Sequence, residues 1–374
     1  MQSHTSMIQD MLLNRIHYLC KMQEEQKTPS TTPIAELGEF GLIDHLTKNF
    51  PPQDQRIIKG IGDDCAVIET GSDTHFELIT TDILAEGIHF DLAYTPLKHL
   101  GYKSVVVNLS DIYAMNGTPK YITVSVAISS KYTVEAMEEL YTGMYLACQH
   151  YGVEMIGGDT TSSLKGLFIS ITAIGEVEKS KVVYRNGAGV NDLICVSGDL
   201  GAAFMGLQLL EREKQIFKDH PAIQPDLENQ HYILGRQLKP EARKDIIKLL
   251  AEKGVQPTAM MDISDGLSSE LTHICRQSVC GARVYEEKIP IHSDTYEMAV
   301  KMKIDTITAY MNGGEDYELL FTIKQEDFEK VKDLEDISII GHITDPSLGL
   351  RMVSKQGSEV DIAAAGWNAF TETK

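Results

Sequence analysis

Apolar and polar positions along this chain recur at the spacings typical of strands and helices. In the first half they predict strands at 75–84, 120–129 and 166–179, and helices at 34–46, 100–117 and 133–152. Gly152 is expected to cap the last of these helices at its C-terminal end. The segment 153–163 is predicted as a short strand that runs into a loop.

The second half continues the alternation of strands and helices. A strand, a glycine turn and a helix are predicted over 193–213, and a loop over 217–230. Further strand and helix units cover 259–278 and 310–323. The polar segment 179–192 lies between the two halves, and we interpret it as a domain boundary.

The pattern predicts an α/β fold in two domains, because 374 residues exceed the size of one typical core. A helix over 7–22 and a linker that ends near residue 30 predict an N-terminal extension at 1–30. We expect an N-terminal domain at 31–180 and a C-terminal α/β domain at 181–374.

Composition narrows the class of partner. The chain has 34 Lys and Arg against 54 Asp and Glu, so its net charge is −20. Nucleic acid and anionic membrane surfaces need a basic surface, and both are therefore disfavoured as partners. A polyanionic substrate would need a divalent cation to offset this charge.

Cysteine usage and the N-terminus indicate a cytoplasmic protein. The six cysteines form no CxxC pair and no compact framework, which favours reduced thiols over disulfides or a zinc site. The first 23 residues lack the order of basic leader, apolar core and cleavage site that a secretory signal has. No apolar run approaches the roughly 18 residues that span a bilayer.

The common nucleotide-binding motifs are absent from the sequence. There is no GxxxxGK[ST] loop and no protein-kinase signature set. The stretch GIGDDC begins like a GxGxxG fingerprint, but Cys65 stands at the third glycine and no helix is predicted after it. A nucleotide site in this chain must therefore follow another design.

Aspartates recur beside small and apolar residues at predicted strand ends and helix starts. They are Asp64, Asp82, Asp111, Asp159, Asp262 and Asp265. Any one of them alone reads equally as a helix cap or a turn residue. Together they match the hard oxygen ligands of Mg²⁺, to which Thr80 and Thr81 add hydroxyl and carbonyl oxygens. Asp262 and Asp265 are three residues apart, so a helical turn would point both in one direction.

Glycine-bearing turns supply candidate phosphate contacts. GGDTT (157–161) and SGDLGAA (197–203) are predicted turns that can present backbone N–H groups to an anion, although a tight turn alone explains either. Arg185 is a cation in a segment with few others. Glu315 and Asp316 follow two glycines at the head of an apolar strand, which indicates either a hairpin turn or a binding edge.

Seven stretches, in order, resemble the thiamine-monophosphate kinase family of the aminoimidazole-ribonucleotide synthetase-like superfamily. They are GIGDDCAVI, TTDILAEGIHF, VNLSDIYAMNGTP, IGGDTT, AIGEV, MDISDGLSSEL and GGEDYELLFT. The resemblance runs from about Glu36 to the GWNAF segment near the C-terminus. It implies a two-domain aminoimidazole-ribonucleotide synthetase-like fold, with mixed sheets flanked by helices and N-terminal domains that pair into a homodimer.

The resemblance also implies roles for individual residues. The implied metal ligands, for several Mg²⁺ ions, are Asp64, Thr80, Thr81, Asp82, Asp111, Asp159, Asp262 and Asp265. The implied ATP contacts are Gly158, Asp159, Arg185 and Ser264. The implied substrate contacts are His89, Glu315 and Trp367; for Trp367, closure of a core is an equal alternative.

The implied activity is ATP-dependent phosphorylation of thiamine monophosphate to thiamine diphosphate. An acceptor phosphate is already ionised at neutral pH, so we expect direct in-line transfer without a covalent nucleophile or a general base. The alternatives are a purine-pathway synthetase, a selenophosphate synthetase or a non-catalytic Mg–ATP-binding protein. The selenophosphate synthetase is disfavoured because Cys20 lies in the extension, and a carboxamide-dehydrating enzyme of the superfamily is disfavoured because the chain ends FTETK, without a cysteine.

The adjacent Asp63 and Asp64 pose an electrostatic problem, because neighbouring buried carboxylates repel. If this stretch is extended, the two side chains point to opposite faces. We therefore assign Asp64 to the metals and expect Asp63 to hydrogen-bond the neighbouring backbone.

Overall fold

The computed structural model describes residues 32–363, which form two compact units. The described part of the smaller unit comprises a 3₁₀ turn, η1 (Ile34–Glu36), and the helix α2 (Gly38–Thr47). The predicted helix at 34–46 is therefore confirmed from Gly38 onward, and none of its side chains is buried. The predicted extension at 1–30 and Trp367 lie outside the described residues.

The larger unit begins with a mixed six-stranded sheet in the order β1-β2-β3-β6-β4-β5. Its strands are β1 (Ile57–Lys59), β2 (Ala66–Ile68), β3 (His75–Ala85), β4 (Thr118–Ser129), β5 (Glu154–Ser163) and β6 (Leu167–Glu178). Buried and more exposed residues alternate along β6, so one face of this sheet carries a core and the other does not.

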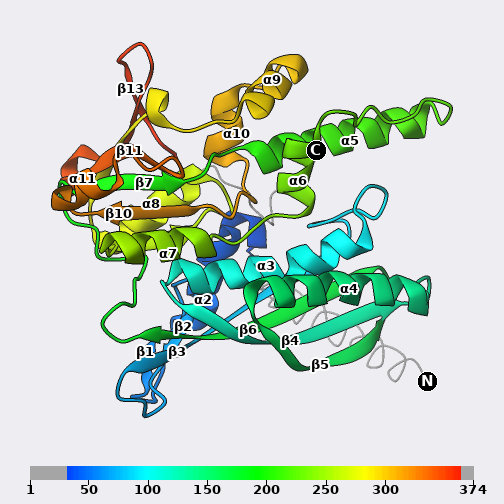
Figure 1. Ribbon diagram of the computed structural model, residues 1–374, viewed down its shortest axis with the longest axis horizontal. Coiled ribbons are helices and arrows are strands. Elements are labelled where there is room, and N and C mark those ends of the chain that lie inside the picture. The colour runs from blue at the N-terminus through cyan, green and yellow to red at the C-terminus, as the bar shows by residue number, and fades with distance from the viewer. Residues whose placement is uncertain (1–31, 364–374) are drawn as a thin grey trace, which may run out of the picture. The chain divides into compact units, whose positions relative to one another are not determined.

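Helices α3 (Leu97–Ala114) and α4 (Val134–Tyr151) cover the core face of this first sheet (Figure 1). They cross closely at two glycines, because a Cβ at Gly101 would lie 1.9 Å from the Leu140 carbonyl oxygen. A Cβ at Gly143 would lie 1.9 Å from the Lys98 carbonyl oxygen. Gly152 caps α4 in the left-handed conformation, as predicted.

A second, seven-stranded sheet follows, in the order β13-β12-β9-β11-β7-β10-β8. Its strands are β7 (Leu193–Ser197), β8 (Ala259–Asp262), β9 (Gly281–Tyr285), β10 (Leu319–Ile323), β11 (Ile337–Thr344), β12 (Leu350–Val353) and β13 (Glu359–Asp361). Only the β12–β9 pair is parallel among its described ladders. Each sheet thus contains one parallel pair among otherwise antiparallel strands. The predicted α/β class is confirmed.

Helices pack on and beside this second sheet (Figure 1). They are α5 (Ala202–Asp219), α6 (His231–Leu238), α7 (Lys244–Lys253), α8 (Leu267–Ser278), α9 (Ser293–Met302), α10 (Thr306–Asn312) and α11 (Phe328–Val331). Short 3₁₀ turns complete the connections at η2 (Glu286–Lys288), η3 (Gln325–Asp327) and η4 (Pro346–Leu348). Within residues 32–363, no helix combines the length and apolar content needed to cross a membrane.

Two sequence-based boundaries are wrong. The segment at 153–163 does not turn into a loop, because β5 continues through it as a parallel partner of β4. Gly158 allows a close approach of β5 to β4, because a Cβ there would lie 1.8 Å from the Val124 carbonyl oxygen. The loop expected from residue 217 starts later, since α5 extends to Asp219.

Candidate functional site

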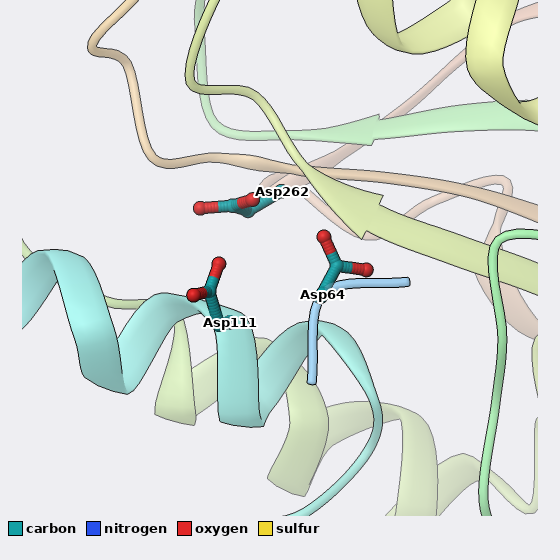
Figure 2. Close-up of side chains that lie close together, drawn as sticks. All are labelled: Asp64, Asp111 and Asp262. Carbon is teal, nitrogen blue, oxygen red and sulfur yellow. The ribbon is translucent and has the colours of Figure 1, made fainter. Parts of the chain in front are cut away.

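Three carboxylates from distant parts of the sequence converge in the larger unit (Figure 2). Asp64 lies in the loop before β2, Asp111 on α3 and Asp262 at the end of β8. Each offers one oxygen, and the three oxygens lie within 4.8 Å of one another. The sheets therefore bring together three of the predicted metal ligands.

Each of the three carboxylates is oriented by a neighbouring side chain. The Ser110 hydroxyl donates to Oδ2 of Asp262 at 2.6 Å, and the Thr80 hydroxyl donates to Oδ2 of Asp111 at 2.5 Å. Arg185 donates from Nη2 to Oδ1 of Asp64 at 2.7 Å. These contacts fix where the remaining carboxylate oxygens point.

The three carboxylates are costly to hold ionised together. Burial, then the charges of Asp82 and Asp262, raise the pKa of Asp111 well above its usual range. Burial and the charge of Asp64 raise the pKa of Asp262 to about 7. Arg185 is the nearby cation that opposes this repulsion at Asp64 and Asp262.

A divalent cation fits this donor set. Oδ2 of Asp64 is buried and has no hydrogen-bond partner among the described residues. A buried carboxylate oxygen without a partner is unfavourable unless a cation compensates it. The donors are all oxygen, which suits Mg²⁺ rather than a softer metal.

Asp82 and Asp265 border the three carboxylates. The Asp82 amide donates to Oδ1 of Asn108 on α3 at 2.9 Å, and its charge contributes to the raised pKa of Asp111. The Asp265 amide donates to Oε1 of Glu270 at 3.0 Å. The helical relation predicted for Asp262 and Asp265 is wrong, because Asp262 ends β8 and α8 begins only at Leu267.

Thr80 and Thr81 lie on opposite faces of β3. Thr80 is buried beside Asp111, whereas the exposed Thr81 hydroxyl donates to the Ile171 carbonyl oxygen at 3.0 Å. The Thr81 hydroxyl therefore points away from Asp111, since strand side chains alternate. A metal contact through the carbonyl oxygen of Thr81 stays a prediction.

Asp63 makes the backbone hydrogen bonds that were predicted, although the backbone is bent rather than extended there, and the assignment of Asp64 to the metals stays a prediction. Oδ1 of Asp63 accepts the backbone N–H groups of Asp64 and Arg185, both at 3.2 Å. Lys59 lies 3.2 Å from Oδ2 of Asp63. Asp63 therefore holds the backbone on either side of the Asp64–Arg185 ion pair, and its hydrogen-bonding role is confirmed.

A second polar cluster lies nearer the N-terminal end of α3. The buried Lys103 ammonium lies 2.9 Å from Oε1 of Glu315 and donates to the Gln237 carbonyl oxygen at 3.1 Å. The Gln237 side chain donates to Oε2 of Glu315 at 2.7 Å. The carboxylate of Glu315 is thus held from two sides while 26% of the side chain stays exposed.

His89 belongs to the same region. Its Nδ1 accepts the Ala85 backbone N–H at 3.0 Å, so the neutral ring carries its proton on Nε2. Burial lowers the pKa of His89, with Lys103 acting in the same direction and Glu315 against it. The structure therefore brings together two of the three predicted substrate contacts, His89 and Glu315.

The loop of Glu315 is joined to the loop of the metal-ligand candidates. The Glu315 amide donates to the Ser264 carbonyl oxygen at 2.7 Å, and the Tyr317 amide to the Ile263 carbonyl oxygen at 2.9 Å. Glu315 and Tyr317 both have positive φ, of 58° and 52°. Strained conformations of this kind persist where the surrounding structure fixes them, often at functional sites. This segment is a loop before β10 rather than a hairpin turn.

The predicted nucleotide contacts Gly158 and Asp159 line a separate cavity of about 360 Å³ on β5. Val124, Tyr141, Met155, Gly157 and Thr160 complete its lining. Gly158 stands in one row of the first sheet with Asp82, three strands away, which corresponds to about 14 Å. Among residues 32–363, Asp159 is not part of the group of three converging carboxylates.

Three amides of the SGDLGAA turn already have partners within the protein. Within it, Gly198 donates to the Asp336 carbonyl oxygen and Leu200 to that of Pro290. The Gly201 amide, at the start of α5, donates to the buried Oδ2 of Asp316 at 2.8 Å. The alternative of a tight structural turn therefore fits this segment.

Sequence reasoning missed three residues at these sites. Lys103 and Ser110 lie seven positions apart on one stripe of α3, where one meets Glu315 and the other Asp262. A lysine inside an otherwise buried helix was the available signal for Lys103. Tyr141 lines the cavity on β5, but one tyrosine on an amphipathic helix gives no comparable signal.

Comparison with known proteins connects this geometry to a family. Residues 62–177 match the family AIR synthase related protein, N-terminal domain, and residues 189–352 match its C-terminal domain. The thiamine-monophosphate kinase of Bacillus subtilis (strain 168) is 32% identical over 339 residues, which cover 89% of this chain and 100% of that protein. The thiamine-monophosphate kinase of Aquifex aeolicus (strain VF5) is 35% identical, covering 81% of this chain and 92% of that protein.

A solved structure agrees over the same length. "AaThiL complexed with AMPPCP and TMP" superposes with a TM-score of 0.78 at 32% identity, covering 91% of this chain and 99% of that one. The aminoimidazole-ribonucleotide synthetase-like fold expected from the sequence is thereby confirmed. With relatives this similar along almost their whole length, the chain belongs to the thiamine-monophosphate kinase family.

Proposed function

We propose that this chain transfers the γ-phosphate of ATP to thiamine monophosphate, giving thiamine diphosphate and ADP. Similarity to thiamine-monophosphate kinases over nearly their full length supports this reaction. The observation in this chain that carries the proposal is the convergence of Asp64, Asp111 and Asp262 beside the loop that holds Glu315. The three carboxylates suit a metal ion bound to phosphate, and the loop of Glu315 suits the organic part of the acceptor.

Magnesium ions would be held by the carboxylates of Asp64, Asp111 and Asp262, with Asp82 and Asp265 at their border. When bound, Mg²⁺ offsets the negative charge of the two substrates and helps to align their phosphates. Arg185 adds a fixed cation to the same region, since its guanidinium is ion-paired with Asp64 and 16% of its side chain is exposed. Ser110 and Thr80 keep the carboxylates in position throughout.

The acceptor end of the site is proposed to be the cluster of Lys103, Glu315 and His89. Lys103 and Ser110 are two turns of α3 apart, so this cluster lies about 10 Å along the helix from the carboxylates. A ring system bound by Glu315 and His89 would leave its phosphate directed to the metal end. Trp367 remains a predicted contact in this scheme.

The nucleotide is proposed to use the cavity on β5 for its base. Tyr141 and Met155 offer apolar contact there, and Gly158 has no side chain that would fill the cavity. Ser264 and Arg185, near the converging carboxylates, are proposed to contact the phosphates. Transfer is proposed to be direct and in line, because an ionised acceptor phosphate needs alignment more than it needs a base.

We further propose a homodimer formed by N-terminal domains. The face of the first sheet opposite α3 and α4 carries exposed apolar side chains, among them Ile83, Tyr121 and Phe168. An exposed apolar face of this kind on a sheet favours association with another surface. Under this proposal, residues 31–180 contribute the metal, ATP and dimer surfaces, and residues 181–374 contribute the Asp262 and Glu315 loops.

The function is tested by ADP release from purified full-length protein with Mg²⁺ and ATP. Thiamine monophosphate is compared with thiamine, with other monophosphates and with no acceptor, and thiamine diphosphate is identified by mass. Asp262→Asn serves as the inactive control, since it keeps an acceptor for Ser110 but removes one charge; its rate should fall by about two orders of magnitude or more. Asp73→Asn, an exposed change, should leave the rate unaltered.

We expect thiamine monophosphate, and none of the other acceptors, to stimulate ADP release. ATP turnover with a different acceptor only would favour another enzyme of the superfamily. Binding of Mg–ATP without turnover of any acceptor would indicate a non-catalytic binding protein. Either outcome would overturn the proposal.

A further inference from the structure

The C-terminal end of α8 places two cysteines against each other. Val279 follows the helix in the left-handed conformation, with φ 52° and ψ 53°. The amides of Val279 and Cys280 both donate to the Cys275 carbonyl oxygen, the second at 3.0 Å. The Cys280 bond is the six-to-one hydrogen bond of a Schellman motif, which typically brings the side chains of its first and last residues into contact.

In this chain both residues of that contact are cysteines. Cys275 is buried in the core of the second sheet, and the half-buried Cys280 packs against the same core. The interaction between the two thiols lowers the pKa of Cys280 and raises that of Cys275. The more accessible sulfur is therefore also the one more readily ionised, which is the form that reacts with oxidants.

The described cysteines outside this pair differ from Cys280. Cys65, Cys148 and Cys195 are buried, and burial raises the pKa of each thiol. Buried thiols held in the protonated form are inert toward oxidants. Selective reaction is thus expected at the end of α8.

The last turn of α8 is also bonded to the loops around the carboxylate site. The Gln277 side chain donates to the Gly62 carbonyl oxygen at 2.8 Å. The Ser278 hydroxyl oxygen accepts the amides of Gly187 and Ala188 at 3.1 and 3.2 Å. These two loops carry Asp64 and Arg185, which form an ion pair. A rearrangement of this turn would therefore displace the loops that hold the pair.

We propose that Cys275 and Cys280 are a reversible oxidation site that a hydroperoxide converts to a disulfide. The Cys280 thiolate attacks one peroxide oxygen, the O–O bond breaks, and a sulfenic acid forms while hydroxide leaves and takes a proton. The Cys275 thiol then attacks that sulfur and passes its proton to the departing hydroxide, so that the S–S bond forms and the second oxygen leaves as water. Two thiols lose two electrons in total, and hydrogen peroxide is reduced to two waters.

The sequence makes the disulfide easy to identify. Trypsin cleaves after Arg276, between the two cysteines, and therefore gives peptides 254–276 and 277–283. Full-length folded protein is treated with hydrogen peroxide, alkylated and digested without reductant. We expect the two peptides to be joined, with a mass 2 Da below their sum, and to separate after dithiothreitol. Peptides that contain Cys148 and Cys195 should stay alkylated.

Cys280→Ser is the matched variant, because it removes one thiol outside the proposed catalytic site. Its reduced form should match the wild type in ADP release; after peroxide the wild type should lose at least half of its rate and the variant should not. This activity arm rests on the proposed function, whereas the peptide arm does not. Separate peptides after oxidation would overturn the site, and a joined but fully active enzyme would overturn its link to the Asp64 loop.

Discussion

Lys103 shows how one buried side chain connects the two sheets. A lysine is rarely buried unless it is paired. Lys103 lies on α3, which covers the first sheet, and its partner Glu315 lies in the loop before β10 of the second sheet. The charge of Lys103 holds the Glu315 carboxylate in place, and under the proposed function that carboxylate accepts a hydrogen bond from the substrate. Lys103 acts through Glu315, so it is a positioning residue for the proposed acceptor.

Lys103→Met should weaken the use of thiamine monophosphate more than the use of ATP. Removing one partner of a buried pair leaves the other charge uncompensated. We expect the KM for thiamine monophosphate to rise about tenfold or more while the KM for ATP changes less than about twofold, measured by steady-state ADP release. Lys103→Arg, which keeps the charge, should restore part of the loss.

A double variant separates positioning from general destabilisation. In Lys103→Met/Glu315→Gln, the second change should add little to the first if the two residues act as one unit. Equal increases in both KM values, or fully additive losses, would contradict the positioning role and indicate a structural tie between the sheets.

The sequence predicted individual residues here better than their orientation. Asp64, Asp111 and Asp262 converge as expected, because small and apolar neighbours place them at the edge of a core. The orientation of Thr81 depends on which face of β3 meets α3, and the spacing of Asp262 and Asp265 depends on where α8 begins. Both are set by packing between distant segments, so local spacing alone could not predict them.

At the scale of elements, the N-terminal end of α5 is closed by a buried acid. Oδ2 of Asp316 accepts the Gly201 amide at 2.8 Å, and Oδ1 of Asp316 is buried without a hydrogen-bond partner among the described residues. Burial raises the pKa of Asp316 to about 7, against the opposing effects of Arg236 and the Gly201 amide. The folded protein therefore binds the acid's proton more tightly than the unfolded chain does.

This raised pKa predicts a pH dependence of stability. An acid with a folded-state pKa above its unfolded value of 3.8 contributes most below that value, and the contribution is lost as pH rises through about 7. Asp316→Asn cannot ionise but keeps an acceptor for Gly201. Relative to the wild type, its unfolding free energy should therefore rise by about 1.4 kcal/mol for each pH unit between pH 5 and the folded-state pKa, and stay level from there to pH 8.

Urea denaturation at a series of pH values measures this difference. Glu297→Gln, an exposed change on α9, provides the control and should show no comparable trend. A constant difference between the wild type and Asp316→Asn from pH 5 to pH 8 would show that Asp316 stays ionised in the folded chain.

The same scale shows where pattern reading of elements fails. The long amphipathic helices α3 and α4 and the alternating strand β6 were predicted because one face of each is buried. Strand β5 was cut short because Gly157 and Gly158 resemble a turn. Gly158 is needed instead for the close approach of β5 to β4, a long-range constraint that leaves no periodic signal.

At the scale of the whole molecule, the face of the first sheet opposite α3 and α4 provides the test of assembly. Phe168 on β6 points to this face, away from α3 and α4, and is 37% exposed in the single chain. Phe168→Asp should leave the core intact but place an uncompensated charge in a paired interface. Sedimentation or light scattering at micromolar concentration should show a dimer for the wild type and a monomer for the variant. Val300→Asp, a similar change at an exposed position on α9, should remain a dimer. A monomeric wild type would exclude the homodimer, and a Phe168→Asp protein that still pairs would exclude this face as its interface.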